Sequence, residues 1–186
     1  MTIPLIGLAG AARSGKDTAA SFLTKDGWQR RAFADLVREM LYQLNPWLPD
    51  DEVDGSFQLA GEVDRFGWEQ VKKEYPVVRE YLQRCGTEAG RQVLGPDVWV
   101  DTLFRGFETW ERPTVITDVR FPNEAEAIKK RRGLVVQVVR PDEAPIPESQ
   151  HVSERALDDW PFDATVLNDG SEVQLGVRLR SLASSM

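Results

Sequence analysis

The feature that most constrains the fold of this 186-residue chain is a glycine-rich segment close to its start. Residues 10–16 read Gly-Ala-Ala-Arg-Ser-Gly-Lys and fit the pattern G-x-x-x-x-G-K. An apolar run over residues 3–9 precedes the segment, and a helical pattern over residues 15–25 follows it. In that setting the backbone N–H groups of such a loop surround an anion, and the lysine reaches the outer phosphates of a nucleotide. The sequence therefore predicts a phosphate-binding loop between a first strand and a first helix.

The residue after the loop lysine departs from the common pattern. A Ser or Thr hydroxyl normally binds Mg²⁺ there, whereas this chain has Asp17 followed by Thr18. Several small-molecule kinases have G-K-x-T, and in them we expect the later Thr to hold the α-phosphate. Arg13 adds a cation where charge develops during phosphoryl transfer. The chain also has no N-K-x-D guanine signature, so the loop favours a small-molecule kinase over a GTPase-like switch.

Beyond the loop, short apolar runs alternate with helical patterns, which predicts an α/β fold with a mostly parallel sheet. The predicted strands cover residues 3–9, 28–33, 115–118, 134–139 and 164–167. The predicted helices cover residues 15–25, 34–44, 69–74, 77–94, 97–110 and 122–132, with a last one after residue 171. Residues 45–67, with prolines, glycines and a run of acids, are interpreted as a flexible segment or an excursion from this core. Residues 140–160, with three prolines, are interpreted as an excursion.

Asp118 follows a buried apolar run, at the carboxyl end of a predicted strand. Ligands of open α/β sheets bind at that edge. We interpret Asp118 as the acid that holds Mg²⁺ through water, and the alternative is an acid that starts a helix or a turn. Arg120 lies two residues further on and is expected to meet the same phosphates.

Composition excludes several other kinds of chemistry. The single cysteine, Cys85, rules out an internal disulfide and a thiolate-rich metal site, and the single histidine, His151, rules out a His-pair zinc motif. A net charge of −7 argues against a nucleic-acid-binding protein. No apolar run approaches the roughly 18 residues that span a bilayer, and no signal peptide is expected. These observations favour a cytoplasmic protein that uses carboxylates, Lys, Arg and backbone groups.

Segments spread along nearly the whole chain resemble a phage-type deoxynucleoside monophosphate kinase. Asp118-Val-Arg-Phe-Pro-Asn-Glu124 is the most specific of them. The others are residues 7–18, 32–35, 84–91, 99–101, 151–154 and 167–171. The chain is similar, more distantly, to dephospho-coenzyme A kinase in the loop, the Asp35 region and the turn at residues 168–171.

The resemblance implies a P-loop NTPase fold of the nucleoside monophosphate kinase type, with a five-stranded parallel sheet flanked by helices. It implies one kinase domain, whose core comprises residues 1–33, 96–140 and 159–186. Residues 34–95 would form a nucleoside-monophosphate-binding helical region, and residues 141–158 a lid. A phage-encoded kinase of this type would act in the host cytoplasm, as a monomer or homodimer without nucleic acid or membrane.

The resemblance also implies roles for individual residues, with ATP and Mg²⁺ as phosphoryl donor and metal. Lys16, Arg13, Asp35 and Arg120 would be catalytic. The donor would be bound by Gly10, Ala11, Ala12, Arg13, Ser14, Gly15, Lys16, Asp17, Thr18, Arg155, Asn168 and Gly170, and Arg140 could also close over ATP. The acceptor would be bound by Asp35, Arg38, Arg84, Glu88, Arg91, Trp99 and Arg120. The metal would be held by Asp118 through water, with Asp17 as a second candidate. For Trp99 the alternative is packing in the core, and for His151 a phosphate contact and a packed surface position stay open.

The chemistry of a monophosphate acceptor suits this set of residues. Its second pKa lies near about 6, so it is largely a dianion at neutral pH and needs no general base. The protein has to align two polyanions and offset their charge. Three alternatives remain: a dephospho-coenzyme A kinase-like or other small-molecule kinase, in which Asp35 would be the base; a nucleotide-dependent binding or switch protein; and a nucleic-acid-binding module.

Overall fold

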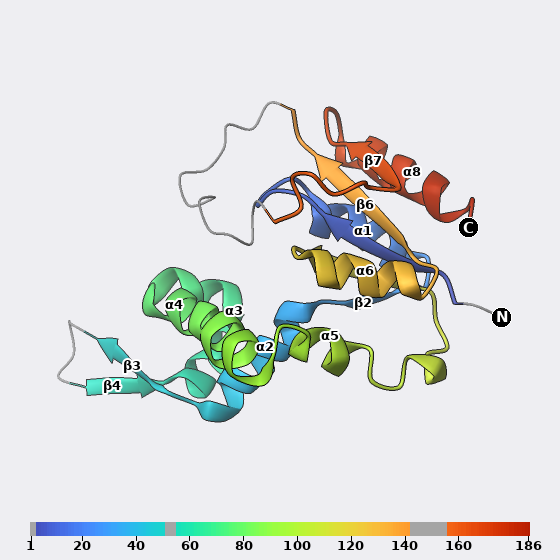
Figure 1. Ribbon diagram of the computed structural model, residues 1–186. Coiled ribbons are helices and arrows are strands. Elements are labelled where there is room, and N and C mark those ends of the chain that lie inside the picture. The colour runs from blue at the N-terminus through green and yellow to red at the C-terminus, as the bar shows by residue number, and fades with distance from the viewer. Residues whose placement is uncertain (1–2, 51–54, 142–155) are drawn as a thin grey trace. The chain divides into compact units, whose positions relative to one another are not determined.

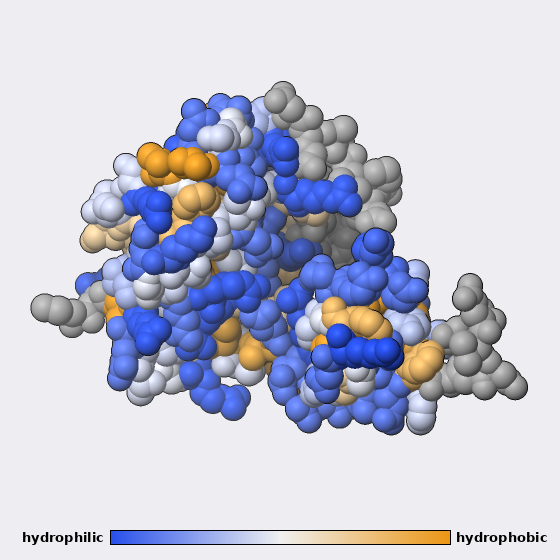
Figure 2. Space-filling view, turned by 180° about the vertical axis from the view of Figure 1, so that it is seen from behind, coloured by the Kyte–Doolittle hydropathy of each residue, from blue (hydrophilic) through white to orange (hydrophobic). Residues whose placement is uncertain are grey.

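The computed structural model describes residues 3–50, 55–141 and 156–186 (Figure 1). The chain divides into two compact units, one formed by Met1–Phe33 with Phe104–Met186, the other by Ala34–Leu103. Over the described ranges, no helix combines the length and the apolar character that crossing a membrane requires. Hydrophilic side chains dominate the face drawn in Figure 2, where apolar side chains gather only in small groups.

The first unit is built on a five-stranded sheet in which every neighbouring pair is parallel. The strand order is β2-β5-β1-β6-β7. The strands are β1 (Leu5–Ala9), β2 (Gln29–Arg31), β5 (Thr114–Val119), β6 (Leu134–Val139) and β7 (Ala164–Leu167). Their apolar, β-branched sequences suit strands that are covered on both faces. The predicted α/β class and five-stranded parallel sheet are confirmed.

Helices cover both faces of this sheet (Figure 1). On one face lie α1 (Lys16–Lys25) and α8 (Glu172–Ala183), which contact one another. Leu23 of α1 and Leu175 of α8 pack into one buried cluster with sheet residues such as Leu8. On the other face lies α6 (Pro122–Lys130), with a proline in its first turn and Lys129 and Lys130 in its last. This order of a proline at the start and lysines at the end complements the helix dipole.

The helix predicted over residues 97–110 is wrong in its second half. Helix α5 covers only Val98–Leu103, and after a turn a short 3₁₀ helix, η2, covers Phe107–Thr109. Gly106 interrupts the helix because its φ of 73° lies in the left-handed region. The residues beyond α5 instead form an aromatic cluster, in which Phe104 stacks on Trp110 with ring centroids 5.7 Å apart.

The second unit is mostly helical and includes a two-stranded antiparallel sheet. Its helices are α2 (Phe33–Leu44), α3 (Leu59–Glu74), α4 (Val77–Gln83), the π-helix η1 (Arg84–Leu94) and α5. Helix α4 runs directly into η1, since Gln83 and Arg84 keep helical backbone angles. The core of this unit is a separate apolar cluster that includes Leu41, Val71 and Val78.

Residues 45–67, predicted as a flexible segment or an excursion from the core, lie in the second unit and consist mostly of regular secondary structure where the structure describes them. Strands β3 (Trp47–Asp50) and β4 (Gly55–Gln58) pair with one another, and α3 already begins at Leu59. Leu48 and Leu59 are fully buried in the core of the second unit. The prolines, glycines and acids of this stretch suggested irregular structure, whereas the burial of Leu48 and Leu59 holds it in the core of the second unit.

Candidate functional site

The phosphate-binding loop leaves the sheet at its central strand. Ala9 is the last residue of β1, and it pairs with Val119 of β5 on one side and with Gln137 of β6 on the other. The carboxyl ends of three parallel strands therefore meet around Gly10, where the loop begins. This edge of a parallel sheet is where ligands bind in open α/β folds.

The loop has the backbone conformation that its glycines were expected to provide. Gly15 precedes α1 with φ at 100°, and a Cβ atom there would lie 2.5 Å from Asn168 Nδ2. The side chain of Asn168 in turn donates a hydrogen bond from Nδ2 to Ser14 O at 3.0 Å. Asn168, 154 positions further along the chain than Ser14, thus packs against the loop. No residue larger than glycine fits at position 15 beside it.

Two side chains of the loop suit a phosphate ligand. Lys16 Nζ lies against the loop, 2.7 Å from Gly10 O and 2.6 Å from Ala11 O. Ser14 is 3% exposed, and its Oγ is a buried polar atom without a hydrogen-bond partner in the described structure. A buried hydroxyl normally has a partner. An oxyanion held at the head of α1, near its positive dipole end, would supply one.

The turn between β7 and α8 is held firmly against the loop. The backbone N–H of Asn168 donates to Val139 O at 2.7 Å, and Ser171 caps α8 by accepting from Gln174 N. Arg178 donates to Leu167 O and, at 2.6 Å, to Asp169 Oδ1. The hydrogen bond from Arg178 lowers the pKa of Asp169 below its ordinary value. These hydrogen bonds therefore hold the turn in place beside the phosphate-binding loop.

A half-open cavity of about 300 Å³ lies between the loop and this turn. Its lining includes seven residues that the sequence assigned to donor binding: Arg13, Gly15, Lys16, Asp17, Thr18, Asn168 and Gly170. Arg140, at the end of β6, also lines it, whereas Arg155 and His151 lie outside the described residues. Glu172 and Leu175 line the cavity too. The sequence analysis missed them, although both belong to the helix that follows the predicted turn.

Asp118 stands at the sheet edge, as predicted, but it also serves a structural purpose. Its Oδ1 accepts a hydrogen bond of 2.9 Å from the backbone N–H of Phe33, the first residue of α2. This contact matches the alternative interpretation, an acid that starts a helix, and it leaves the metal role untested. Asp17, the second metal candidate, is exposed in the first turn of α1.

The loop after β5 is held by a buried carboxylate. Glu124 is 2% exposed, and its Oε2 accepts hydrogen bonds from Arg120 N at 2.7 Å and from Phe121 N at 3.1 Å. In the sequence, Glu124 stood out only as the last residue of the segment Asp118–Glu124. The structure adds that its side chain fixes the backbone of Arg120 at the sheet edge.

The residues expected to bind the acceptor lie, except for Arg120, in the second unit. Asp35 and Arg38, on α2, form an ion pair with Arg38 Nη1 3.4 Å from Asp35 Oδ1. Arg38 Nη2 also lies 3.6 Å from Glu69 Oε1. Two predicted acceptor residues are therefore brought together, with an acidic neighbour that the sequence analysis did not single out.

Helix η1 carries three further acceptor candidates, Arg84, Glu88 and Arg91, and α5 carries Trp99. Arg91 donates to Pro96 O at 2.8 Å, and Arg84 pairs with Glu88 at 3.5 Å. Trp99 is 6% exposed and donates from Nε1 to the carbonyl of Gly86 at 2.8 Å, so its contacts match core packing.

Known proteins share sequence and fold with this chain. A family model described as deoxynucleotide monophosphate kinase matches residues 45–178. The chain is 32% identical over 157 residues to a putative deoxynucleotide monophosphate kinase of Acanthamoeba polyphaga mimivirus, covering 74% of each chain. It is 35% identical over 85 residues to the deoxynucleoside-5'-monophosphate kinase of Escherichia phage T5, covering 42% of this chain and 34% of that protein. The crystal structure of TT1252 from Thermus thermophilus shares the fold, with a TM-score of 0.52 and 19% identity, over 100% of this chain and 99% of that one.

Proposed function

The chain belongs to the deoxynucleotide monophosphate kinase family, and from this premise we propose that it transfers the γ-phosphoryl group of ATP to a deoxynucleoside monophosphate in the presence of Mg²⁺. Membership of the family makes it a phosphotransferase. One observation carries the choice of a nucleoside triphosphate as donor. The loop at the head of α1 holds a buried Ser14 hydroxyl that has no hydrogen-bond partner among the described residues, and Lys16 Nζ lies on the same loop, 2.7 Å from Gly10 O.

The donor half of the reaction rests on groups of the first unit. Lys16 and the amides at the start of α1 would bind the outer phosphates, and Thr18 the α-phosphate. Arg13, which lines the same cavity, would offset the charge that develops on the transferred group. The turn at Asn168 and Gly170 would face the base. Arg140 and Arg155 would close over the nucleotide, Arg155 from a lid at residues 141–158.

The residues present suit Mg²⁺ bound largely by phosphates. Among the described residues no group of three or more His, Cys, Asp or Glu side chains could form a metal cage. Mg²⁺ commonly binds through one or two carboxylates together with substrate phosphates and water. Asp118, through water, and Asp17 would supply those carboxylates. The bound ion would neutralise phosphate charge and help to orient the donor.

The acceptor half rests on the helical region of residues 34–95 and on Arg120. Arg38 and Arg91 would bind the acceptor phosphate with Arg120, and Asp35 would orient the nucleoside. Since the acceptor phosphate is already largely a dianion, no side chain has to remove a proton. Arg84 and Glu88 would complete the acceptor site. Trp99 is the weakest acceptor ligand in this proposal, because it is 6% exposed and donates to the carbonyl of Gly86.

A coupled assay that measures ADP formation tests the proposal. The acceptors are the common deoxy- and ribonucleoside monophosphates, with dephospho-coenzyme A as the rival substrate. We expect turnover that requires a deoxynucleoside monophosphate and Mg²⁺, and none without an acceptor. Turnover only with dephospho-coenzyme A would replace the proposed acceptor. Nucleotide binding without turnover on any acceptor would favour the switch-protein alternative. Such a kinase would act in the cytoplasm on small molecules.

A further inference from the structure

The cavity beside the phosphate loop is lined by one carboxylate that phosphate binding does not explain. Its cations are Lys16, Arg13 and Arg140, which suit the phosphates of the donor. Asp17 is a candidate for the metal. Glu172 is a second acid in the lining, and its negative charge repels phosphate. In the absence of a metal, a favourable contact between Glu172 and a bound donor therefore has to involve the nucleoside.

The backbone that carries Glu172 is fixed against the phosphate loop. Glu172 is the first residue of α8 and follows the helix cap, Ser171. A Cβ atom at Gly15 would lie 3.3 Å from Leu175 Cδ2, so the first turn of α8 packs directly on the loop. Asn168 holds the preceding turn to the same loop. Only the side-chain torsions of Glu172 are therefore left to adjust to a ligand.

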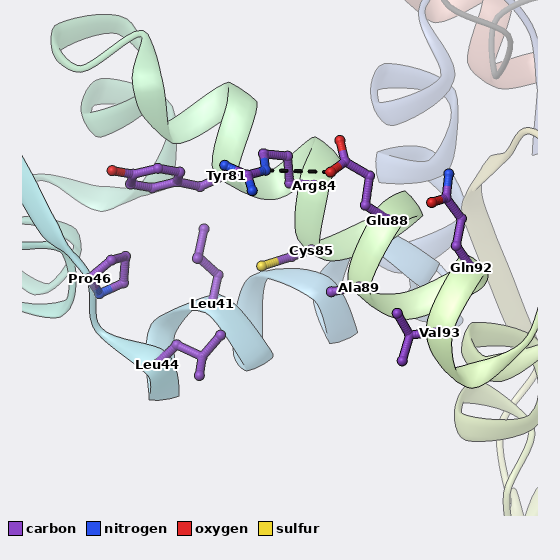
Figure 3. Close-up of a pocket in the computed structure, with 10 residues that line it drawn as sticks. All are labelled: Leu41, Leu44, Pro46, Tyr81, Arg84, Cys85, Glu88, Ala89, Gln92 and Val93. Atoms are coloured by element: carbon purple, nitrogen blue, oxygen red, sulfur yellow. Dashed lines mark ion pairs between the residues drawn. The ribbon is translucent and has the colours of Figure 1, made fainter.

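The carboxylate of Glu172 is available to a ligand. It is exposed, and it forms no hydrogen bond or ion pair with the residues that the structure describes. Asp169, on the same turn, is instead held by Arg178 at 2.6 Å. A larger cavity of about 530 Å³ within the second unit shows the same contrast, since its two charged residues, Arg84 and Glu88, pair with one another (Figure 3). Glu172 thus keeps its hydrogen-bonding capacity for a molecule that enters the donor cavity.

The chemistry of a carboxylate limits which base it can favour. An ionised carboxylate accepts hydrogen bonds and donates none. Adenine has an amino group at its 6-position, which donates, whereas guanine has a carbonyl oxygen there, which only accepts. We propose that Glu172 selects adenine as the base of the donor, by accepting a hydrogen bond from the 6-amino group and by repelling the 6-oxygen of guanine. This inference rests on the proposed function, in which the turn before Glu172 faces the base of the donor.

Binding of nucleoside diphosphates tests the selection without any phosphoryl transfer. Isothermal titration calorimetry would compare ADP, GDP and IDP, without Mg²⁺ and without an acceptor. We expect the wild-type chain to bind ADP at least about tenfold more tightly than GDP or IDP. In Glu172→Gln the amide can either accept from an amino group or donate to a carbonyl oxygen. The affinities of this variant for ADP and GDP should therefore lie within about threefold of each other.

The ratio of affinities separates base selection from other effects of the charge. Loss of a negative charge near the phosphates strengthens the binding of all three nucleotides alike, and a change in the stability of α8 affects them alike, so both effects cancel in the ratio. The matched control is Glu126→Gln, which removes the same charge from an exposed position on α6, outside the cavity. We expect it to keep the wild-type ratio.

Three results would overturn the proposal. The first is a ratio of ADP to GDP affinity that Glu172→Gln leaves unchanged. The second is tighter binding of GDP than of IDP that is lost in this variant, which would place Glu172 at the 2-amino group of guanine. The third is an effect confined to ADP relative to 2′-deoxy-ADP, which would place Glu172 at the ribose. Absence of turnover on every deoxynucleoside monophosphate would refute the proposed function and leave these binding results unaffected.

Discussion

Replacement of Glu124 by alanine gives the most direct test of how the sheet edge is built. The carboxylate of Glu124 is 2% exposed and accepts hydrogen bonds from the backbone of Arg120 and Phe121. The side chain occupies the third position of α6, where a glutamate can complete a capping box. Alanine removes the charged acceptor of both part-buried hydrogen bonds from the backbone N–H groups of Arg120 and Phe121.

The expected loss follows from these two contacts. A hydrogen bond to a charged group contributes about 1.5–3 kcal/mol. The alanine variant no longer has the desolvation penalty of a buried carboxylate, and this gain offsets part of the free energy lost with the two hydrogen bonds. We therefore expect Glu124→Ala to lower the free energy of unfolding of the first unit by about 2–4 kcal/mol. Glu124→Gln keeps one acceptor oxygen without its charge, so its loss should be about half as large.

Urea denaturation followed by tryptophan fluorescence measures the loss. Trp28, Trp110 and Trp160 report on the first unit. The matched control is Glu126→Ala, which removes the same charge from an exposed position of the same helix. A difference below about 0.5 kcal/mol between Glu124→Ala and this control would refute the reasoning, because it would mean that the buried acceptor contributes no more than an exposed glutamate.

Three further predictions concern the donor site and pH. Lys16→Ala should retain the fold by circular dichroism yet lose more than about nine-tenths of the phosphoryl-transfer rate, and a folded, active variant would contradict the loop assignment. Asp118→Asn should keep the hydrogen bond from Phe33 N, and hence wild-type stability, while it raises the Mg²⁺ concentration for half-maximal rate about tenfold; an unchanged metal dependence would leave Asp118 as a helix cap. The hydrogen bond from Arg180 lowers the pKa of Asp26 below its ordinary 3.8, so this carboxylate stabilises the fold above about pH 4 and its contribution is lost as pH falls through the lowered value. Urea midpoints measured from about pH 6 down to about pH 2 should therefore fall less steeply in Asp26→Asn than in wild type.

The sheet and its flanking helices were predictable because their signals are local. Residues 134–139 and 164–167 were predicted as strands, and the structure has β6 and β7 at the same bounds. The proline, acids and lysines of α6 define its direction without any tertiary information. Parallel strands buried on both faces are almost uniformly apolar, so their sequences identify them.

The hairpin and the first half of α3 were not predictable in this way. Their stability comes from Leu48 and Leu59, which become fully buried only when the second unit has assembled. Pro49 lies in β3, where a two-stranded sheet tolerates it because each strand has a free edge. At residues 104–110 the packing of Phe104 on Trp110 prevails over a helical pattern. Tertiary contacts therefore decide the structure where local signals conflict.

One part of the candidate site could likewise be predicted from local sequence, and another part could not. The phosphate loop is a contiguous segment, so its function could be inferred from residue types and spacing. The convergence of Arg140 and Glu172 on the same cavity depends on the strand order, which places β6 beside β1 and β7 beside β6. No spacing in the sequence encodes that neighbourhood. The hydrogen bond from Asn168 to Ser14, which lie 154 positions apart in the chain, also depends on the strand order.

The assignment of a kinase rests on two separate parts of the chain, and the sheet joins them. The family model matches residues 45–178, which do not include the phosphate loop. The loop was identified from residues 10–16 and has the expected geometry in its own right. Strand β1, which leads into the loop, is hydrogen-bonded on one side to β5 and on the other to β6, and both of these strands lie inside the matched region. The loop thus follows the central strand of this sheet, between two strands of the matched region, at the edge where Asp118 and Arg120 lie. This position favours the proposal that the loop and the matched region act in one phosphoryl-transfer site.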